Sequence, residues 1–316
     1  MKPRILVIAG PTASGKSDLA ISLAKQLDGE IVCADSLTVY RGFNIGSAKP
    51  TPLQRSEVPH HLIDIRDPHE NFTAADFLHG ASKAITAITE RGRVPIVAGG
   101  TGLYIRTLLG GLSDAPAADA ETRNILQQRA MTEGRQALFE ELRKVDPASA
   151  EQCHPNNIVR IIRALEVWHT TGRQASSFRH EHGFAEQRYE HLSICLHLPR
   201  PELYSRIDRR VDAMLAAGLV EEVTALLESS VPADSKPLAA IGYKEVVAFL
   251  KGENDRETMA DMIKQNTRNF AKRQITWFKK ESAMHPVAYP ENSDTIFTAA
   301  EKFLREGEKP DVQDPL

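Results

Sequence analysis

The sequence predicts an α/β fold in which a parallel sheet, built around a phosphate-binding loop, carries helices on both faces. Three features of the chain predict it. A glycine-rich loop at 10–17 follows an apolar strand at 5–9 and opens an amphipathic helix at 18–27. Strand and helix patterns alternate from residue 1 to about 111. A helical stretch at 113–190 then interrupts this alternation, which predicts an all-helical domain inserted into the α/β core.

The loop has the complete pattern of a P-loop and consists of Gly10, Pro11, Thr12, Ala13, Ser14, Gly15, Lys16 and Ser17. Its glycines let backbone N–H groups wrap around phosphate oxygens, and the following helix points the positive end of its dipole at them. Lys16 adds a positive charge, and Ser17 is placed to hold a Mg²⁺ ion. The pattern predicts a phosphate or diphosphate site without saying which compound binds.

Asp35 is the candidate for acid–base chemistry. P-loop NTPases generally end a second buried strand with an acid that helps hold the metal, but the strand at 94–98 ends in a Gly-Gly-Thr-Gly turn that contains Thr101. Asp35 instead closes the strand at 31–34. Because ligands of an open parallel sheet bind at the carboxyl ends of strands, Asp35, Thr101 and the P-loop are expected to converge on one crevice. There Asp35 is either a general base or a cap of the following turn.

The periodicities divide the chain into a core and an insertion. Residues 1–112 and 191–306 are expected to form the P-loop α/β core, 113–190 the helical insertion and 307–316 a disordered tail. Helical patterns cover 73–91 in the core and 120–131, 134–145 and 156–171 in the insertion, and a strand at 192–198 is followed by helices to the end of the chain.

Composition is typical of a water-soluble globular protein, with 41% hydrophobic and 26% charged residues and a net charge of −3. No apolar run approaches the roughly 18 residues needed to span a bilayer, so no membrane association is expected. Cys33, Cys153 and Cys195 are isolated, which favours a reducing cytoplasm over a disulfide framework. His60 and His61 are adjacent and point in different directions, so a metal site there is disfavoured.

Basic residues gather in two places. The stretch 262–280 has no acid, and its Lys264, Arg268 and Lys272 recur every fourth residue along one helical face. This stretch is either an amphipathic helix that buries its aromatic residues or a basic ridge for a polyanion. Arg160 and Arg163 likewise form either a solvated helix face or part of a nucleic-acid site.

Several motifs of the chain resemble those of the tRNA dimethylallyltransferases, in the same order and over about residues 4–280. They are GPTASGKS (10–17), DS (35–36) followed by VYRG (39–42), IGSAKP (45–50), PHHLID (59–64), GGTGLY (99–104), HPNN (154–157) with RIIRALE (160–166), IGYKE (241–245) and AKRQITW (271–277). Members of this family transfer a dimethylallyl group from dimethylallyl diphosphate to N6 of the adenosine immediately 3′ of the anticodon in tRNA. The chain is similar to the bacterial type, since it has no cysteine pair for a C-terminal zinc finger.

The resemblance implies roles for individual residues. The P-loop would cradle the diphosphate of the donor with Mg²⁺ at Ser17, while Thr101 and Arg210 would grip this leaving group. Asp35 would be the general base that takes the proton from adenine N6, and the adenosine would flip out of its stack to reach it. The anticodon stem-loop would be contacted by Asp35, Ser36, Leu37, Thr38, Thr101, Arg123, Arg160, Arg163 and Lys244.

Two departures from the family pattern concern RNA recognition. Many members have Gln in place of Thr38 and a polar or basic residue in place of Val159. Thr38 keeps a hydroxyl but loses the paired donor and acceptor of an amide, so base readout is expected to be relaxed or relocated.

Other functions stay open on the residues alone. Isopentenylation of free adenine nucleotides would use the same donor site, but the insertion and the basic stretch favour a macromolecular acceptor. A small-molecule kinase would need ATP at the P-loop, and a noncatalytic RNA-binding module would not need an intact P-loop. A cleft formed within one chain requires no partner subunit, so a monomer is expected.

Overall fold

The computed structural model describes residues 2–183, 186–281 and 283–307. The chain forms two compact units, a core unit of Met1–Leu109 with Arg188–Leu316 and a helical unit of Gly110–Gln187. The boundaries expected from the sequence, 112/113 and 190/191, each lie three residues after the observed ones. Of the predicted tail, Gly307 ends the last helix, and the rest lies outside the described residues.

The centre of the core unit is a six-stranded sheet in the order β3-β2-β4-β1-β5-β6, in which every neighbouring pair is parallel. The strands are β1 (Arg4–Ala9), β2 (Gly29–Cys33), β3 (His60–His61), β4 (Val94–Gly99), β5 (Glu190–His197) and β6 (His285–Ala288). The predicted α/β class with a parallel sheet is confirmed. Because β2, β4 and β1 are neighbours, the segments that follow their carboxyl ends emerge at one edge of the sheet.

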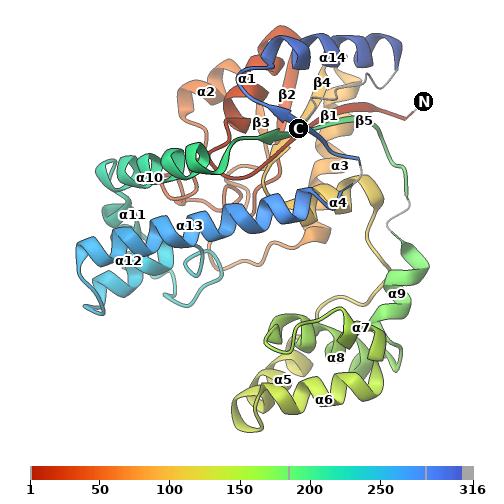
Figure 1. The fold of residues 1–316 in the computed structure, drawn as a ribbon, viewed down its shortest axis with the longest axis vertical. Helices are drawn as coiled ribbons and strands as arrows, with labels where there is room; N and C mark the ends of the chain where they lie inside the picture. Colours follow the sequence, from red (N-terminus) through yellow and green to blue (C-terminus); the bar gives the residue numbers. More distant parts are fainter. Residues whose placement is uncertain (1, 184–185, 282, 308–316) are drawn as a thin grey trace. The chain divides into compact units, whose positions relative to one another are not determined.

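Helices cover both faces of the sheet, as Figure 1 shows. Along β1, Ile5 and Val7 belong to one hydrophobic cluster and Leu6 and Ile8 to the other, so successive side chains enter opposite cores. The first cluster includes residues of α3, α4 and α10 to α13, and the second residues of α1 and α14. The core helices are α1 (Lys16–Gln26), α2 (Pro52–Glu57), α3 (Ala74–Glu90), α4 (Gly102–Gly110), α10 (Arg200–Ala216), α11 (Leu219–Glu228), α12 (Tyr243–Leu250), α13 (Arg256–Phe278) and α14 (Ser293–Glu306).

The expectation that only helices follow the strand at 192–198 is wrong. The strand β6 pairs in parallel with β5, with Pro286 opposite Cys195. Proline has no N–H to donate, but an edge strand leaves one side of its backbone unpaired and therefore tolerates it.

The helical unit has a hydrophobic core of its own. Its helices are α5 (Ala120–Thr132), α6 (Arg135–Val145), α7 (Pro147–Glu151), α8 (Ile158–Thr171) and α9 (Ala175–His182). Leu126, Leu138, Leu142, Ile161 and Leu165 are fully or almost fully buried against one another. The helices predicted in this part of the sequence are present, with ends that differ by one or two residues.

None of the helices in the described ranges is long and apolar enough to cross a membrane. The three cysteines are free.

Candidate active site

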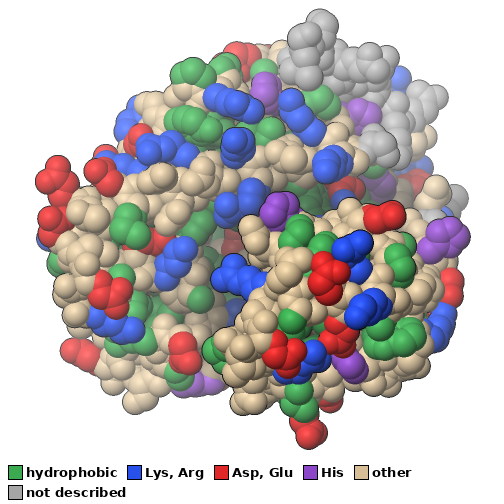
Figure 2. Space-filling view, turned by 60° about the horizontal axis from the view of Figure 1, so that its bottom comes forward, with side chains coloured by type: hydrophobic (Ala, Val, Ile, Leu, Met, Phe, Trp, Pro, Cys, Tyr) green, Lys and Arg blue, Asp and Glu red, His purple; other side chains and the backbone are tan. Residues whose placement is uncertain are grey.

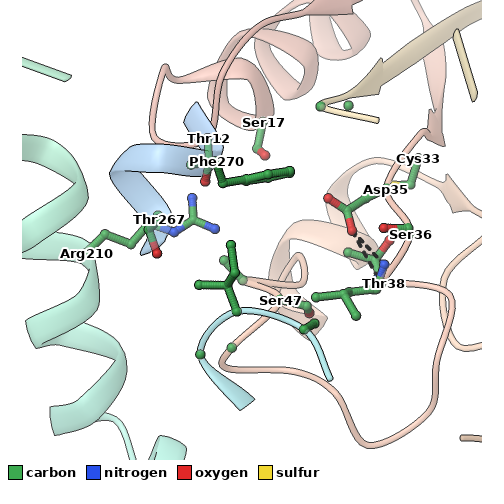
Figure 3. A pocket seen from close by; sticks show the side chains of 18 of the residues that line it. Thr12, Ser17, Cys33, Asp35, Ser36, Thr38, Ser47, Arg210, Thr267 and Phe270 are labelled. Atoms are coloured by element: carbon green, nitrogen blue, oxygen red, sulfur yellow. Dashed lines mark hydrogen bonds between the residues drawn. The ribbon is translucent and has the colours of Figure 1, made fainter. Parts of the chain in front are cut away.

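A cavity of about 560 Å³ lies in the core unit where β1, β2 and β4 end. Residues from well-separated segments line it, and those with a predicted role are Thr12, Lys16, Ser17, Asp35, Ser36, Leu37, Thr38, Arg210 and Lys244. Ser17 and Asp35 point into the cavity from the P-loop helix and the end of β2, and Arg210 enters from α10 on the opposite side (Figure 3). Lys16, Ser17 and Arg210 of the predicted donor site thus share one crevice with Asp35, the predicted base.

The P-loop places Lys16 at the cavity. Gly15 is the N-cap of α1, and its φ of 91° lies in the left-handed region that favours glycine, so the P-loop leads directly into the first turn of this helix. Lys16 Nζ donates a hydrogen bond to the carbonyl oxygen of Pro11 at 2.6 Å. Burial, reinforced by the positive charge of Arg210, lowers the pKa of Lys16 to about 8. Burial also lowers the pKa of Arg210, while the charge of Asp35 opposes this shift.

The charges around the cavity favour an anionic ligand. Its described lining contains five cationic side chains, Lys16, Arg210, Lys236, Lys244 and Arg273, and a single carboxylate, Asp35. Positive charges that are partly removed from water are stabilised by a multivalent anion. Val211, Met214 and Ile263 add an apolar surface to the same cavity, so it also suits a hydrocarbon group next to an anion.

Asp35 both caps a turn and faces the cavity. Its Oδ1 accepts hydrogen bonds from the backbone N–H groups of Leu37 at 2.8 Å and Thr38 at 3.4 Å. In the described part of the chain its Oδ2 has no hydrogen-bond partner. The carboxylate is therefore held in a fixed orientation with one oxygen available to a ligand, so capping and proton transfer are compatible.

The segment after Asp35 forms another part of the cavity wall. Thr38 is 6% exposed, and its hydroxyl has no hydrogen-bond partner among the described residues. A buried hydroxyl without a partner is available to a polar group of a ligand. Lys244, the second residue of α12, also lines the cavity, and its Nζ lies 3.6 Å from an oxygen of Glu245.

The residues of the cavity fit a magnesium ion that would be held mainly by the phosphate oxygens of a bound substrate. Ser17 is exposed at the start of α1 and lines the cavity. Within the described ranges no cluster of three or more His, Cys, Asp or Glu side chains forms a metal cage. Mg²⁺ commonly keeps several waters and is bound by few protein groups together with substrate phosphates, so a single serine hydroxyl is compatible with it.

Thr101 is not among the residues that line the cavity. It immediately follows Gly100, which does line it, and its N–H donates to the carbonyl oxygen of Ala34 at 3.2 Å. Thr101 therefore lies beside the peptide that leads into Asp35, one residue outside the cavity wall. Gly10, Pro11, Ala13, Ser14 and Gly15 of the P-loop also lie outside the lining.

The proposed basic ridge is partly neutralised. Lys264 Nζ lies 2.6 Å from Asp212 Oδ1, and Arg268 Nη1 lies 2.7 Å from Asp208 Oδ1, both on α10. Two of the three regularly spaced cations thus bind the neighbouring helix, which sequence periodicity could not reveal. Positive and negative side chains are interspersed on the face of the molecule in Figure 2.

The arginines of the helical unit differ in their surroundings. Arg123 Nη2 donates to Glu166 Oε2 at 2.8 Å, and Arg163 Nη1 lies 3.2 Å from the same oxygen. Arg163 Nη2 also donates to the carbonyl oxygen of Pro116 at 2.6 Å. Since Glu166 is fully buried, it anchors both arginines. Arg160 is exposed and has no ion pair within the described part of the chain.

Some lining residues have no predicted role in the active site. Gln274, Phe270 and Lys236 line the cavity, as does His60, whose Nδ1 lies 2.7 Å from the carbonyl oxygen of Val58. His61 instead contacts Glu30 at 2.6 Å. The AKRQITW motif was a signal for Gln274, although no role was assigned to it.

Fold and cavity together define a P-loop α/β protein whose cationic site contains one oriented carboxylate. The sequence model of the IPP transferase family matches residues 38–281. The chain belongs to this family.

Similar sequences and similar solved structures support this membership. The chain is 64% identical to tRNA dimethylallyltransferase 1 of Trichlorobacter lovleyi over 96% of this chain and all of the relative. It is similar to the tRNA isopentenylpyrophosphate transferase of Bacillus halodurans, with a TM-score of 0.72 and 39% identity over 96% of this chain and 98% of the other. A eukaryotic dimethylallyltransferase acting on tRNA gives a TM-score of 0.83 at 28% identity, over 98% of this chain and 81% of the other.

Proposed function

We propose that this enzyme transfers the dimethylallyl group of dimethylallyl diphosphate to N6 of the adenosine immediately 3′ of the anticodon in tRNA. The observation that carries the proposal is the composition of the cavity, where Lys16 and Arg210 accompany the single carboxylate of Asp35 and an apolar surface. The sequence of the chain matches two tRNA dimethylallyltransferases over nearly their full length.

The donor side of the reaction requires stabilisation of a leaving group. As the allylic C–O bond breaks, its electron pair stays with the diphosphate, whose negative charge grows. Lys16, Arg210 and the N–H groups of the P-loop would stabilise this charge because they are already in place. Mg²⁺ bound by the Ser17 hydroxyl and diphosphate oxygens would supply further positive charge. Val211 and Met214 would shelter the dimethylallyl group from water.

The acceptor side requires removal of one proton. The N6 atom of adenine is a weak nucleophile because its lone pair is delocalised into the ring. As N6 bonds to the allylic carbon its proton becomes acidic, and Asp35 would accept it through Oδ2. The adenosine would have to leave its stack, and the free hydroxyl of Thr38 is suited to a polar edge of the flipped base.

The anticodon stem-loop would also bind outside the cavity. Arg160 is the best candidate of the helical unit for a phosphate contact, since Arg123 and Arg163 share the buried Glu166. We expect the enzyme to act as a monomer, because residues of one chain line the cavity. We also expect it to act in the cytoplasm.

Labelled substrates test the function. With labelled dimethylallyl diphosphate and unmodified tRNA, label should enter the tRNA as N6-dimethylallyladenosine and diphosphate should be released. Labelled AMP should remain unmodified, and labelled ATP should give no phosphorylated product. Transfer to AMP in preference to tRNA would favour a nucleotide isopentenyltransferase, and phosphoryl transfer from ATP would favour a kinase.

A further inference from the structure

Gln274 of α13 connects the P-loop to the end of β4. Its side chain is buried, with 6% exposure. Its Oε1 accepts a hydrogen bond from the backbone N–H of Thr12 at 2.9 Å, and its Nε2 donates one to the carbonyl oxygen of Gly100 at 2.9 Å. A primary amide both accepts and donates, so one side chain satisfies a group from each of two separate loops.

The turn after β4 packs closely against this part of α13. A Cβ atom at Gly100 would lie 2.4 Å from Gln274 Nε2, and one at Gly102 would lie 2.3 Å from the ring of Trp277. Both distances are far shorter than van der Waals contact. Glycine at these two positions therefore allows Gln274 and Trp277 of the AKRQITW motif to dock against the turn.

Both partners of Gln274 belong to the candidate donor site. Thr12 is part of the P-loop and lines the cavity, as Gly100 does. The carbonyl group that Gln274 binds belongs to the peptide bond between Gly100 and Thr101. Gln274 thus links the P-loop to the segment that carries Thr101.

The hydrogen bond between Gln274 and the Thr12 N–H also affects the conformation of the P-loop. In a P-loop the backbone N–H groups are the expected phosphate donors. The Thr12 N–H donates its hydrogen bond to Gln274 Oε1, so it points toward α13. This hydrogen bond holds this part of the loop in one conformation. A loop held in its binding conformation loses less conformational entropy when a ligand binds.

We propose that Gln274 is a positioning residue that fixes the P-loop relative to the Gly100–Thr101 peptide and thereby sets diphosphate affinity and the reactivity of the bound donor. The proposal rests on the function proposed above. Gln274 acts through Thr12 and Gly100, and no contact with the reacting atoms is required. Small displacements of positioned groups reduce rates strongly, so both binding and the chemical step should depend on it.

Two substitutions disturb this link from opposite sides. Gln274→Met keeps the volume of the side chain but removes both hydrogen bonds, and Gly100→Ala displaces the amide. Each should weaken inorganic pyrophosphate binding about tenfold and lower kcat about tenfold. Their effects should not add in the double variant, because both act on the same contact. The matched control is Gln265→Met at an exposed position of the same helix, which should leave both quantities unchanged.

Calorimetric pyrophosphate titrations of the full-length variants, alongside their melting temperatures, test the proposal. Unchanged pyrophosphate affinity in folded Gln274→Met, whatever its melting temperature, overturns it, as do additive effects in the double variant. Should Gln274→Met not fold, normal affinity in Gly100→Ala overturns it equally. If the wild type binds pyrophosphate in a Gln274-dependent way but transfers no dimethylallyl group, the proposed function fails while the positioning role stands.

Discussion

Single residues in this cavity serve two purposes at once, and Asp35 is the clearest case. From the sequence alone, cap and general base are alternatives for this residue. Oδ1 forms the cap with Leu37 and Thr38, while Oδ2 faces the cavity without a partner in the described part of the chain. The cap is observed, and the role as base stays a prediction for which the cap supplies the orientation.

Asp35→Asn separates these two purposes. Asparagine keeps an oxygen that accepts the two backbone N–H groups, but its amide cannot take a proton. The kcat for transfer should fall about 10²- to 10⁴-fold while the Kd values for pyrophosphate and tRNA change little. Single-turnover kinetics with bound donor and tRNA measure this, and a near-normal rate would reduce Asp35 to a cap.

Lys16 gives the donor site a pH dependence. Its pKa of about 8 in the free protein means that the ammonium group loses its proton above this pH. A bound diphosphate favours the charged form and raises the pKa. Above pH 8, Lys16 must take up a proton when pyrophosphate binds, so the affinity for pyrophosphate should be lower there. Below pH 8, Lys16 is already protonated and this free-energy cost disappears.

Calorimetry at pH 7 and pH 9 in buffers of different ionisation enthalpy measures the proton uptake. Lys16→Met should bind pyrophosphate more weakly at pH 7 and lose this uptake. The ionisation of pyrophosphate itself is common to both proteins and cancels in the comparison. Equal proton uptake by the two proteins would show that Lys16 does not titrate in this range.

At the scale of elements, the strands and helices that were predicted are those whose burial leaves a clear pattern. The strands β1, β2 and β4 contribute buried side chains to both hydrophobic clusters and appear in the sequence as apolar runs, while β5 appears as an alternation with Leu192, Ile194 and Leu196. The edge strands β3 and β6 have only two and four residues, too few for a periodic signal. The role of Gln274 was not predictable either, because its partners lie 174 and 262 residues away in sequence.

Helix α8 presents two arginines that sequence spacing treated as equivalent, and the structure separates them. Arg160→Ala should flatten the slope of log K against log salt for tRNA binding by about 0.7 per lost phosphate contact and leave the melting temperature unchanged. Arg163→Ala should lower the melting temperature, since it removes a partner of the buried Glu166.

A salt series of tRNA titrations on both variants measures the difference. Arg135→Ala, at an exposed position of α6, is the control for loss of charge alone. If Arg160→Ala and Arg135→Ala give the same slope as the wild type, Arg160 belongs to a solvated helix face and the RNA contacts lie elsewhere.

The cations of helix α13 also differ from one another in their surroundings. Arg268 is bound to Asp208, whereas Arg273 lines the cavity with its guanidinium 5.7 Å from the ring centre of Phe270. Arg273→Ala should weaken tRNA binding with little loss of stability, because no ion pair in the described chain is broken. For Arg268→Ala, thermal melting should show a loss of stability and filter binding should show little loss of tRNA affinity. Equal loss of tRNA affinity in both variants would restore the continuous basic ridge.

At the scale of the whole molecule, the chain consists of two units with separate cores. The core unit has a hydrophobic cluster on each face of its sheet, and the helical unit has its own cluster around Leu138 and Leu165. The candidate donor-site residues at the cavity all belong to the core unit. A ligand of this site therefore stabilises the core unit directly, and the helical unit only if both units unfold together.

Hydrogen exchange distinguishes these two possibilities. At 100 times its Kd, pyrophosphate should stabilise the form that binds it by about 2.7 kcal/mol, which slows exchange through unfolding of the core unit about 100-fold. Amides of β1, β4 and α1 should show this slowing, while those of α6 and α8 should exchange as in the free protein. Adding the anticodon stem-loop should then slow exchange in α8 as well, because the contacts predicted for Arg160 bind the helical unit. Equal slowing of α6, α8 and β1 by pyrophosphate alone would mean that the two units unfold as a single cooperative body.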